Sequence, residues 1–182
     1  MSKRTTDTIT LGSGILYVAE FSGTIPEDET LEVDTNRLGW IKGGAQLQYT
    51  PEYYTAEDDL GKVKKQKITK EEVILTSGIM TWNGKVLEKL TSTGTSTEAS
   101  EKRTTKIGGV GNDNGKSYVL RFVHEDATDG DVRVTIVGKN TSGFTLAFAS
   151  DNETVIDAQF TALPNDSKGT LIIIEEEMDA TA

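Results

Sequence analysis

The chain has 182 residues, no cysteine, and a formal net charge of −10 from 29 acidic and 19 basic residues. Without cysteine it can form neither disulfides nor zinc–thiolate or iron–sulfur sites, and it has no cysteine nucleophile. This composition fits a protein made in a reducing cytoplasm. The acidic balance argues against a binder of double-helical DNA, because such proteins need a basic footprint.

The first residues, MSKRTTDTITLGSG, lack the apolar run of a signal peptide. The longest apolar stretch is LIII at 171–174, far short of the roughly 20 residues that span a membrane. We therefore expect a soluble protein without a membrane anchor. A chain of this length buries roughly 70% of its unfolded surface, so one domain over residues 1–182 is expected to be stable without staples.

Strand-like and polar segments alternate along the first half of the chain. Residues 1–10 are predicted to form a loose N-terminal arm, 23–34 a surface loop with five acids, and 91–100 a Ser/Thr-rich linker without regular structure. Apolar and polar residues alternate as in half-buried strands in the segments 9–21, 40–50 and 67–82.

One helix is predicted, over residues 83–92. Val86, Leu87 and Leu90 follow helical spacing and are expected to pack on the sheet. Asn83 stands where its side chain can cap the first turn.

The second half of the chain is rich in strand signals separated by short polar turns. The Asp-Gly pair within 128–131 is a strong hairpin signal. Further strands are predicted over 116–125, 131–139, 144–149, 153–163 and 169–177. This spacing predicts a mainly β fold, an antiparallel β-sandwich or barrel with one short flanking helix and a long extended loop.

The segment GGVGNDNGKS at 108–117 resembles a phosphate-binding loop only superficially. Val110 stands where the spacing requires glycine, and YVLRFV after it alternates like a strand rather than a helix. Asp113 lies in an NDN run without the glutamate that completes a helical calcium loop. We therefore predict a glycine-rich turn without phosphate or calcium.

Two further features could support catalysis. His124, the only histidine, could act as a base, but a surface histidine at a strand end is the preferred interpretation. Glu175 and Glu177 share a strand face and could form a carboxylate pair, although a solvated charge run is preferred. The sequence thus predicts no catalytic, cofactor-binding or metal-binding residues, and no enzyme.

The most informative segment is a charge-segregated excursion between two strands, with a long inter-subunit loop predicted over residues 49–67. Residues 49–72 hold three of the five tyrosines, then three consecutive acids, then five lysines within nine positions. Aromatic rings supply interface area, and separated charges set register against a partner. The predicted docking residues are Tyr49, Tyr53, Tyr54, Glu57, Asp58, Asp59, Lys62, Lys64 and Lys65. The alternative is a solvated hairpin whose lysines protect an edge strand.

Part of the chain resembles a known protein family. The run LGWIKGGAQLQYTPE, an acidic stretch, LGKVKK and EEVILTSGIMTWNGKVLEKL together resemble the tail tube (major tail) proteins of tailed bacteriophages and tail-like particles, most clearly over residues 10–90. The resemblance implies subunits that form hexameric rings, which stack into a hollow tube for DNA. It implies that the loop at 49–67 reaches the adjacent ring and that the N-terminal arm packs on a neighbour.

The resemblance also implies partners and a location. The partners are further copies of the chain, the tape measure protein and other tail proteins, and the location is the virion tail after synthesis in the cytoplasm of a host bacterium. A DNA conduit should repel phosphate, so acidic groups facing its lumen suit the task. The candidate lumen acids, which are otherwise ordinary solvated acids, are Glu27, Asp28, Glu29, Glu175, Glu176 and Glu177.

The alternative function is a monomeric β-sandwich carbohydrate-binding or adhesin module. Such a module would need an exposed aromatic platform. The chain has two tryptophans, Trp40 and Trp82, and neither lies in a turn with acids and amides. Both are expected in the core or at a subunit contact instead.

Overall fold

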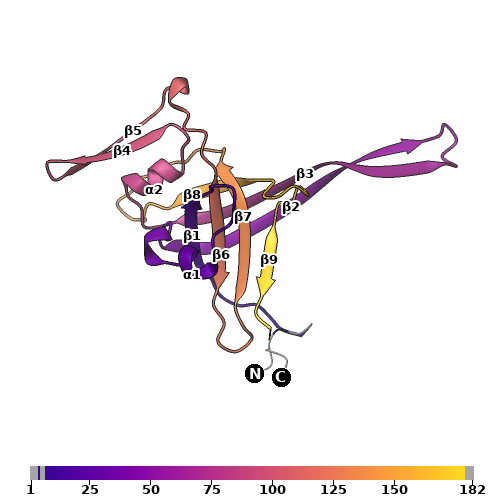
Figure 1. The fold of residues 1–182 in the computed structure, drawn as a ribbon, viewed down its shortest axis with the longest axis horizontal. Coiled ribbons are helices and arrows are strands. Elements are labelled where there is room, and N and C mark those ends of the chain that lie inside the picture. Colours follow the sequence, from indigo (N-terminus) through magenta and orange to yellow (C-terminus); the bar gives the residue numbers. More distant parts are fainter. Residues whose placement is uncertain (1–3, 5–6, 179–182) are drawn as a thin grey trace.

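A computed structural model describes residue 4 and residues 7–178 of the chain (Figure 1). The described residues are mainly β with antiparallel pairing throughout, which confirms the predicted fold class in its sandwich form, because the sheets do not close into a barrel. The strands are β1 (Ile15–Glu20), β2 (Ile41–Glu57), β3 (Lys64–Ile79), β4 (Gly94–Ala99), β5 (Lys102–Ile107), β6 (Tyr118–His124), β7 (Val132–Asn140), β8 (Ile156–Leu163) and β9 (Ile173–Glu176). The helices are α1 (Asp28–Leu31) and α2 (Gly84–Lys89), with 3-10 turns η1 (Asp34–Asn36) and η2 (Val110–Asn112).

Seven strands form one sheet in the order β1-β6-β7-β8-β3-β2, with β9 also paired to β7. One side of β7 pairs with β6 from Val132 to Gly138. Its other side is shared, since Val132–Thr135 pair with β9 and Val137–Asn140 pair with β8. The sheet therefore divides at β7, and β8, β3 and β2 cross the direction of β1, β6 and β7 in Figure 1.

The main core lies between these two parts of the sheet. Phe160 of β8 and Leu75 of β3 are fully buried together with Leu16, Leu120 and Ile136 from the other part. Each buried side chain of this size stabilises the fold by roughly 1.5–3 kcal/mol. The core is thus what brings the two strand directions together.

The predicted helix is confirmed. Val86 and Leu87 of α2 are buried against the core, and Leu90 follows directly after the helix, fully buried. The side-chain oxygen of Asn83 accepts hydrogen bonds from the backbone N–H groups of Lys85 and Val86, at 2.9 and 3.2 Å. Asn83 is therefore the N-cap that the sequence indicated.

The sequence-based predictions of local structure for 91–100, 144–149 and 23–34 are wrong. The linker predicted at 91–100 contains β4, which pairs with β5, because alternating threonines favour a strand. The turn of this hairpin places Ser100 and Glu101 at φ of 50° and 61°, and without glycine it gave no turn signal. Residues 144–149 form no strand.

The loop predicted at 23–34 contains α1, whose Leu31 is fully buried against Tyr17, Val119 and Val137 on the other face of the sheet. The N-terminal arm expected over 1–10 lies in part outside the described residues. Within the described part, Arg4 donates a hydrogen bond to Thr10 Oγ1 at 2.7 Å.

The β4–β5 hairpin packs on α2 through a close approach at Gly84. Ser96 and Thr105 share a hydrogen bond of 3.2 Å, and a Cβ at Gly84 would overlap Thr105 Oγ1 and approach Ser96 Oγ to 2.9 Å. Lys85 adds an ion pair with Glu98 at 3.2 Å. Only a residue without a side chain fits at position 84.

Replacing Gly84 with Ala should therefore push the β4–β5 hairpin away from α2. We expect a loss of about 1–3 kcal/mol in the free energy of unfolding, since overpacking forces backbone shifts, and faster hydrogen exchange in β4 and β5. Gly111→Ala is the matched control, because a Cβ there meets nothing within 4 Å. Equal exchange in both variants would show that this contact does not hold the hairpin.

Candidate assembly surface

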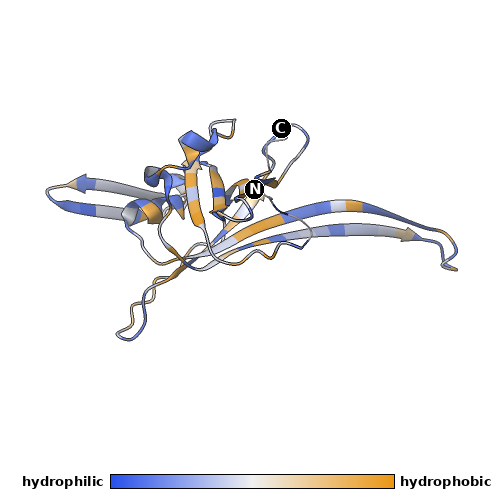
Figure 2. Ribbon diagram, turned by 90° about the horizontal axis from the view of Figure 1, so that it is seen from below, coloured by the Kyte–Doolittle hydropathy of each residue, from blue (hydrophilic) through white to orange (hydrophobic). Residues whose placement is uncertain are grey.

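The segment predicted as a long loop is a β-hairpin that extends beyond the sheet. β2 and β3 pair from Ile41 with Ile79 out to Glu57 with Lys64, so the loop proper is limited to 58–63. β8 pairs with β3 only from Ile74 to Ile79. Residues 49–73, here called the distal hairpin, are therefore a two-stranded ribbon without a described strand on either side (Figures 1 and 2).

Two bulges shape this ribbon. Gly43 and Gly44, with φ of 82° and 76°, are extra residues of β2 near its start. Thr69 is an extra residue of β3, opposite the step from Glu52 to Tyr53, and its hydroxyl donates to Glu52 O at 3.3 Å. Such bulges bend a strand and increase its twist. The extra residue Thr69 shifts β3 by one position, so that Ile68 lies opposite Tyr53.

One face of the distal hairpin continues the core-facing side of β2 and β3. Tyr49 pairs opposite the fully buried Val73, and farther out Tyr53 pairs opposite Ile68. Tyr53 is 51% exposed and Ile68 is 42% exposed. Tyr49, Tyr53 and Ile68 thus give this face exposed apolar area beside the polar residues Glu71, Gln66, Glu57 and Lys64, and no second layer of the described chain covers it.

The opposite face is charged. Tyr54, 65% exposed, pairs opposite Lys67, and Ala56 pairs opposite Lys65. Neither Lys65 nor Lys67 takes part in an ion pair of the described residues. Lys62 in the turn is likewise without one, so three of the five lysines leave their charge available to a partner.

Several other charges of the distal hairpin are paired within it. Lys70 Nζ lies 3.2 Å from Glu52 Oε1, and this carboxylate raises the pKa of Lys70. The Tyr49 hydroxyl donates to Glu71 Oε1 at 2.6 Å, and this hydrogen bond raises the pKa of Tyr49.

Among the predicted docking residues, Glu57 and Lys64 pair with each other at 3.4 Å, and Asp59 is exposed without an ion pair in the described chain. These exposed pairs hold the two strands in register.

The turn at the tip is closed by Asp58. Its carboxylate accepts hydrogen bonds from the N–H groups of Val63 at 2.5 Å and Leu60 at 3.3 Å, and its own N–H donates to Val63 O at 3.0 Å. Gly61, at φ of 66°, supplies the left-handed residue of the turn. The hydrogen bond from Val63 is the main reason that the pKa of Asp58 is lowered. Asp58 is therefore a structural residue of the tip.

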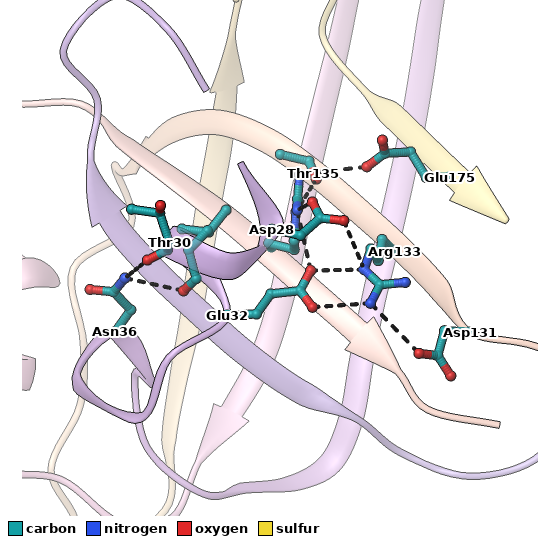
Figure 3. A network of polar contacts seen from close by, with 10 residues as sticks. Asp28, Thr30, Glu32, Asn36, Asp131, Arg133, Thr135 and Glu175 are labelled. Atoms are coloured by element: carbon teal, nitrogen blue, oxygen red, sulfur yellow. Dashed lines mark hydrogen bonds and ion pairs between the residues drawn. The ribbon is translucent and has the colours of Figure 1, made fainter. Parts of the chain in front are cut away.

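The candidate lumen acids separate into two groups. Asp28 and Glu175 belong to a polar cluster around Arg121, whose side chain is 4% exposed (Figure 3). Arg121 donates to Thr135 Oγ1 at 2.9 Å and Glu32 Oε1 at 3.2 Å, contacts Asp28, and lies 3.5 Å from Glu175. These two acids thus neutralise a buried arginine, while their own side chains remain 53% and 51% exposed.

Arg133 extends the cluster. Its Nε and Nη2 donate to the two carboxylate oxygens of Glu32, at 2.8 and 3.1 Å, and this carboxylate raises the pKa of Arg133. Glu177 accepts a hydrogen bond from Asp131 N–H at 3.3 Å. The other candidate acids, Glu27, Glu29 and Glu176, are exposed. The cluster escaped the sequence analysis, although an arginine inside the apolar run YVLRFV at 118–123 is a signal that carboxylates must lie nearby.

His124 is buried, so the prediction of a surface histidine is wrong. Its Nδ1 lies 2.7 Å from Ser13 O, and since a carbonyl only accepts, Nδ1 carries the proton. The glycine-rich segment at 108–117 forms the 3-10 turn η2 and an Asp113 turn, in which Gly115 N–H donates to the Asp113 carboxylate at 3.1 Å.

The two tryptophans differ in burial. Trp40 is 55% exposed, and the guanidinium carbon of Arg37 lies 4.4 Å from its ring centroid. Trp40 is therefore not a core residue. Trp82 is partly buried against the core, with its ring centroid 6.2 Å from that of Phe148.

Within residue 4 and residues 7–178, His, Asp and Glu side chains form no group of three that could hold a metal ion. No helix in the same residues has the length and apolar character of a membrane span. No family model matches the chain, and no curated protein matches it significantly.

Replacing Arg121 with Met should lower the free energy of unfolding by about 3 kcal/mol, because it leaves several carboxylates without their buried partner. Chemical denaturation measures this loss. Arg103→Met is the control, since Arg103 pairs with Glu98 at the surface and such pairs contribute about 0–1 kcal/mol. A loss for Arg121→Met no larger than that of the control would contradict the role assigned to the cluster.

The depressed pKa of Asp58 predicts an acid-sensitive tip. Because the pKa of Asp58 is lower in the folded turn than in the unfolded chain, its ionised carboxylate stabilises the turn at pH values above about 4. This stabilisation is lost as the pH falls through the folded pKa. In an NMR titration, the amide proton of Val63 should shift with a midpoint below about 4. Asp58→Asn should abolish this titration, and a midpoint above 4 would refute the assignment.

Proposed function

We propose that this chain is a structural subunit that acts by self-assembly, forming stacked hexameric rings of the tail tube of a phage or a phage-tail-like particle. DNA passes through the hollow tube without specific binding. The observation that carries the proposal is the distal hairpin, a projecting ribbon on which Tyr49, Tyr53 and Ile68 are left uncovered. The rings and the tube come from the family resemblance over residues 10–90.

The exposure of the distal hairpin favours assembly. A two-stranded ribbon alone is marginally stable in water. Its apolar face gains about 25 cal/mol for each Å² of apolar surface that a neighbour covers. A subunit that projects such a ribbon is therefore more stable in an assembly than in isolation, which supports a self-assembling role.

The open edge of β2 supports the proposal in a second way. β2 has 17 residues, and β3 is its only partner among the described strands. A long unpaired edge is a template for pairing with another strand. The opposite edge, β1, is partly covered, since Leu38 N–H donates to Leu16 O at 2.9 Å and Tyr17 forms a bridge with Arg37.

The charge of the subunit fits a DNA conduit. A net charge of −10 is repeated with each copy around a ring. Exposed acids such as Glu27, Glu29 and Glu176 repel phosphate, wherever a lumen forms. The other proposed partners are the tape measure protein and further tail proteins, and the proposed location is the virion tail.

The proposal is tested by shortening the distal hairpin. Replacing residues 53–68 with Asn-Gly leaves a three-residue loop, with Thr69, between the paired Glu52 and Lys70, a length that hairpins accept. We expect the concentrated wild-type protein to form rings or tubes in negative-stain electron microscopy, and the shortened protein to remain a folded monomer by circular dichroism and light scattering.

The control variant, Lys168→Ala, keeps the full distal hairpin and changes one exposed residue elsewhere. It should assemble like the wild type. Tubes built by the shortened protein would refute the docking role. A wild-type protein that stays monomeric at high concentration would refute self-assembly and favour the carbohydrate-binding module.

A further inference from the structure

A second apolar surface lies on the loop at 141–155, between β7 and β8. Phe148 in this loop is 76% exposed, and its ring leans on that of Trp82 at the edge of the core. The loop is braced internally, since Thr154 Oγ1 donates to Ala147 O at 2.6 Å, and the ion pair of Glu153 with Lys42 ties it to β2. Phe148 is thus a large aromatic side chain presented to solvent on an anchored loop.

The strand register places this loop at the opposite end of β3 from the distal hairpin. β8 begins at Ile156, which pairs with Ile79, the last residue of β3. Ile68 lies 11 residues along β3 from Ile79, which separates the two surfaces by about 36 Å at 3.3 Å per residue, and the tip lies farther still. Figure 1 likewise shows the loop on the side of the body away from the distal hairpin. The two surfaces cannot meet within one molecule.

The two surfaces also carry opposite charges. From 62 to 70 the chain has five lysines and no acid, whereas from 141 to 157 it has three acids and no base. Asp151 and Asp157 are exposed and form no ion pair within the described chain, as is true of Lys65 and Lys67. Because β3 has a free edge in the distal hairpin, its long lysine side chains can reach around that edge.

We propose that the distal hairpin of one copy docks on the 141–155 loop of the next copy. Tyr53 and Ile68 pack against Phe148, and the lysines of β3 face Asp151 and Asp157. This inference rests on the proposed self-assembly and identifies the surface that receives the hairpin. Because the contact joins unlike surfaces of identical chains, it does not close in a dimer and propagates from copy to copy.

The absence of cysteine makes a direct test simple, since every disulfide must come from introduced residues. The double variant Tyr53→Cys/Phe148→Cys, assembled and then oxidised with copper phenanthroline, should give a ladder of covalent oligomers on a non-reducing gel. The matched control is Tyr54→Cys/Phe148→Cys, which places the thiol on the opposite face of the same strand. The single variants Tyr53→Cys and Tyr54→Cys should each give at most disulfide-linked dimers.

The outcomes separate the two proposals. Tubes without a ladder for the Tyr53/Phe148 pair overturn the docking site and leave self-assembly standing. A ladder of equal yield from the Tyr54 control overturns the assignment of the faces. A wild-type protein that never assembles removes both proposals.

Charge reversal provides an independent measurement. Lys65→Glu/Lys67→Glu should raise the concentration needed for assembly about tenfold at low salt, because the variant places like charges opposite Asp151 and Asp157. Adding Asp151→Lys and Asp157→Lys should return the concentration needed for assembly to within about threefold of the wild-type value. If the four-residue variant assembles no better than the double variant, the lysines do not face these acids.

Discussion

The pairing of β3 with β8 ends at Ile74, and the rest of the architecture depends on that limit. On one side of it, β3 is a central strand whose Leu75 and Ile79 are buried in the main core. On the other side, the same strand has β2 as its only partner and becomes half of a projecting ribbon. One continuous strand therefore connects the most stable part of the molecule to its most exposed part, so the ribbon is rigidly anchored without being covered.

This arrangement explains why the sequence predicts the strands of the body better than those of the distal hairpin. In the body, alternation of apolar and polar residues follows burial, so β1, β6, β7 and β8 were placed within a few residues. In the distal hairpin beyond Val73 no face is buried, and Tyr53, Tyr54 and the lysines do not alternate in polarity. Because burial of one face produces the alternation of apolar and polar residues, the sequence of a strand exposed on both faces resembles that of a loop. The same reason hid the threonine-rich β4–β5 hairpin, whose contact with α2 depends on a missing side chain at Gly84.

The candidate acids show the converse difficulty. Glu27, Asp28 and Glu29 look equivalent in the sequence, yet only Asp28 contacts Arg121. Its partners in the cluster come from β6, β7 and β9, and no local spacing relates residue 28 to residues 121 and 175. A buried arginine announces that carboxylates are needed, but only the sheet order determines which ones are close enough.

The polar cluster has a consequence for when a newly made chain becomes complete. It joins Asp28 of α1 to Glu175 of β9 through Arg121 of β6. Arg121 therefore acquires the carboxylate of Glu175 only after synthesis has passed β9. Until then β9 is missing from the side of β7, and that vacant edge is a template for a strand of another nascent chain. Pairing of β9 with β7 covers this edge in the same step that completes the polar cluster.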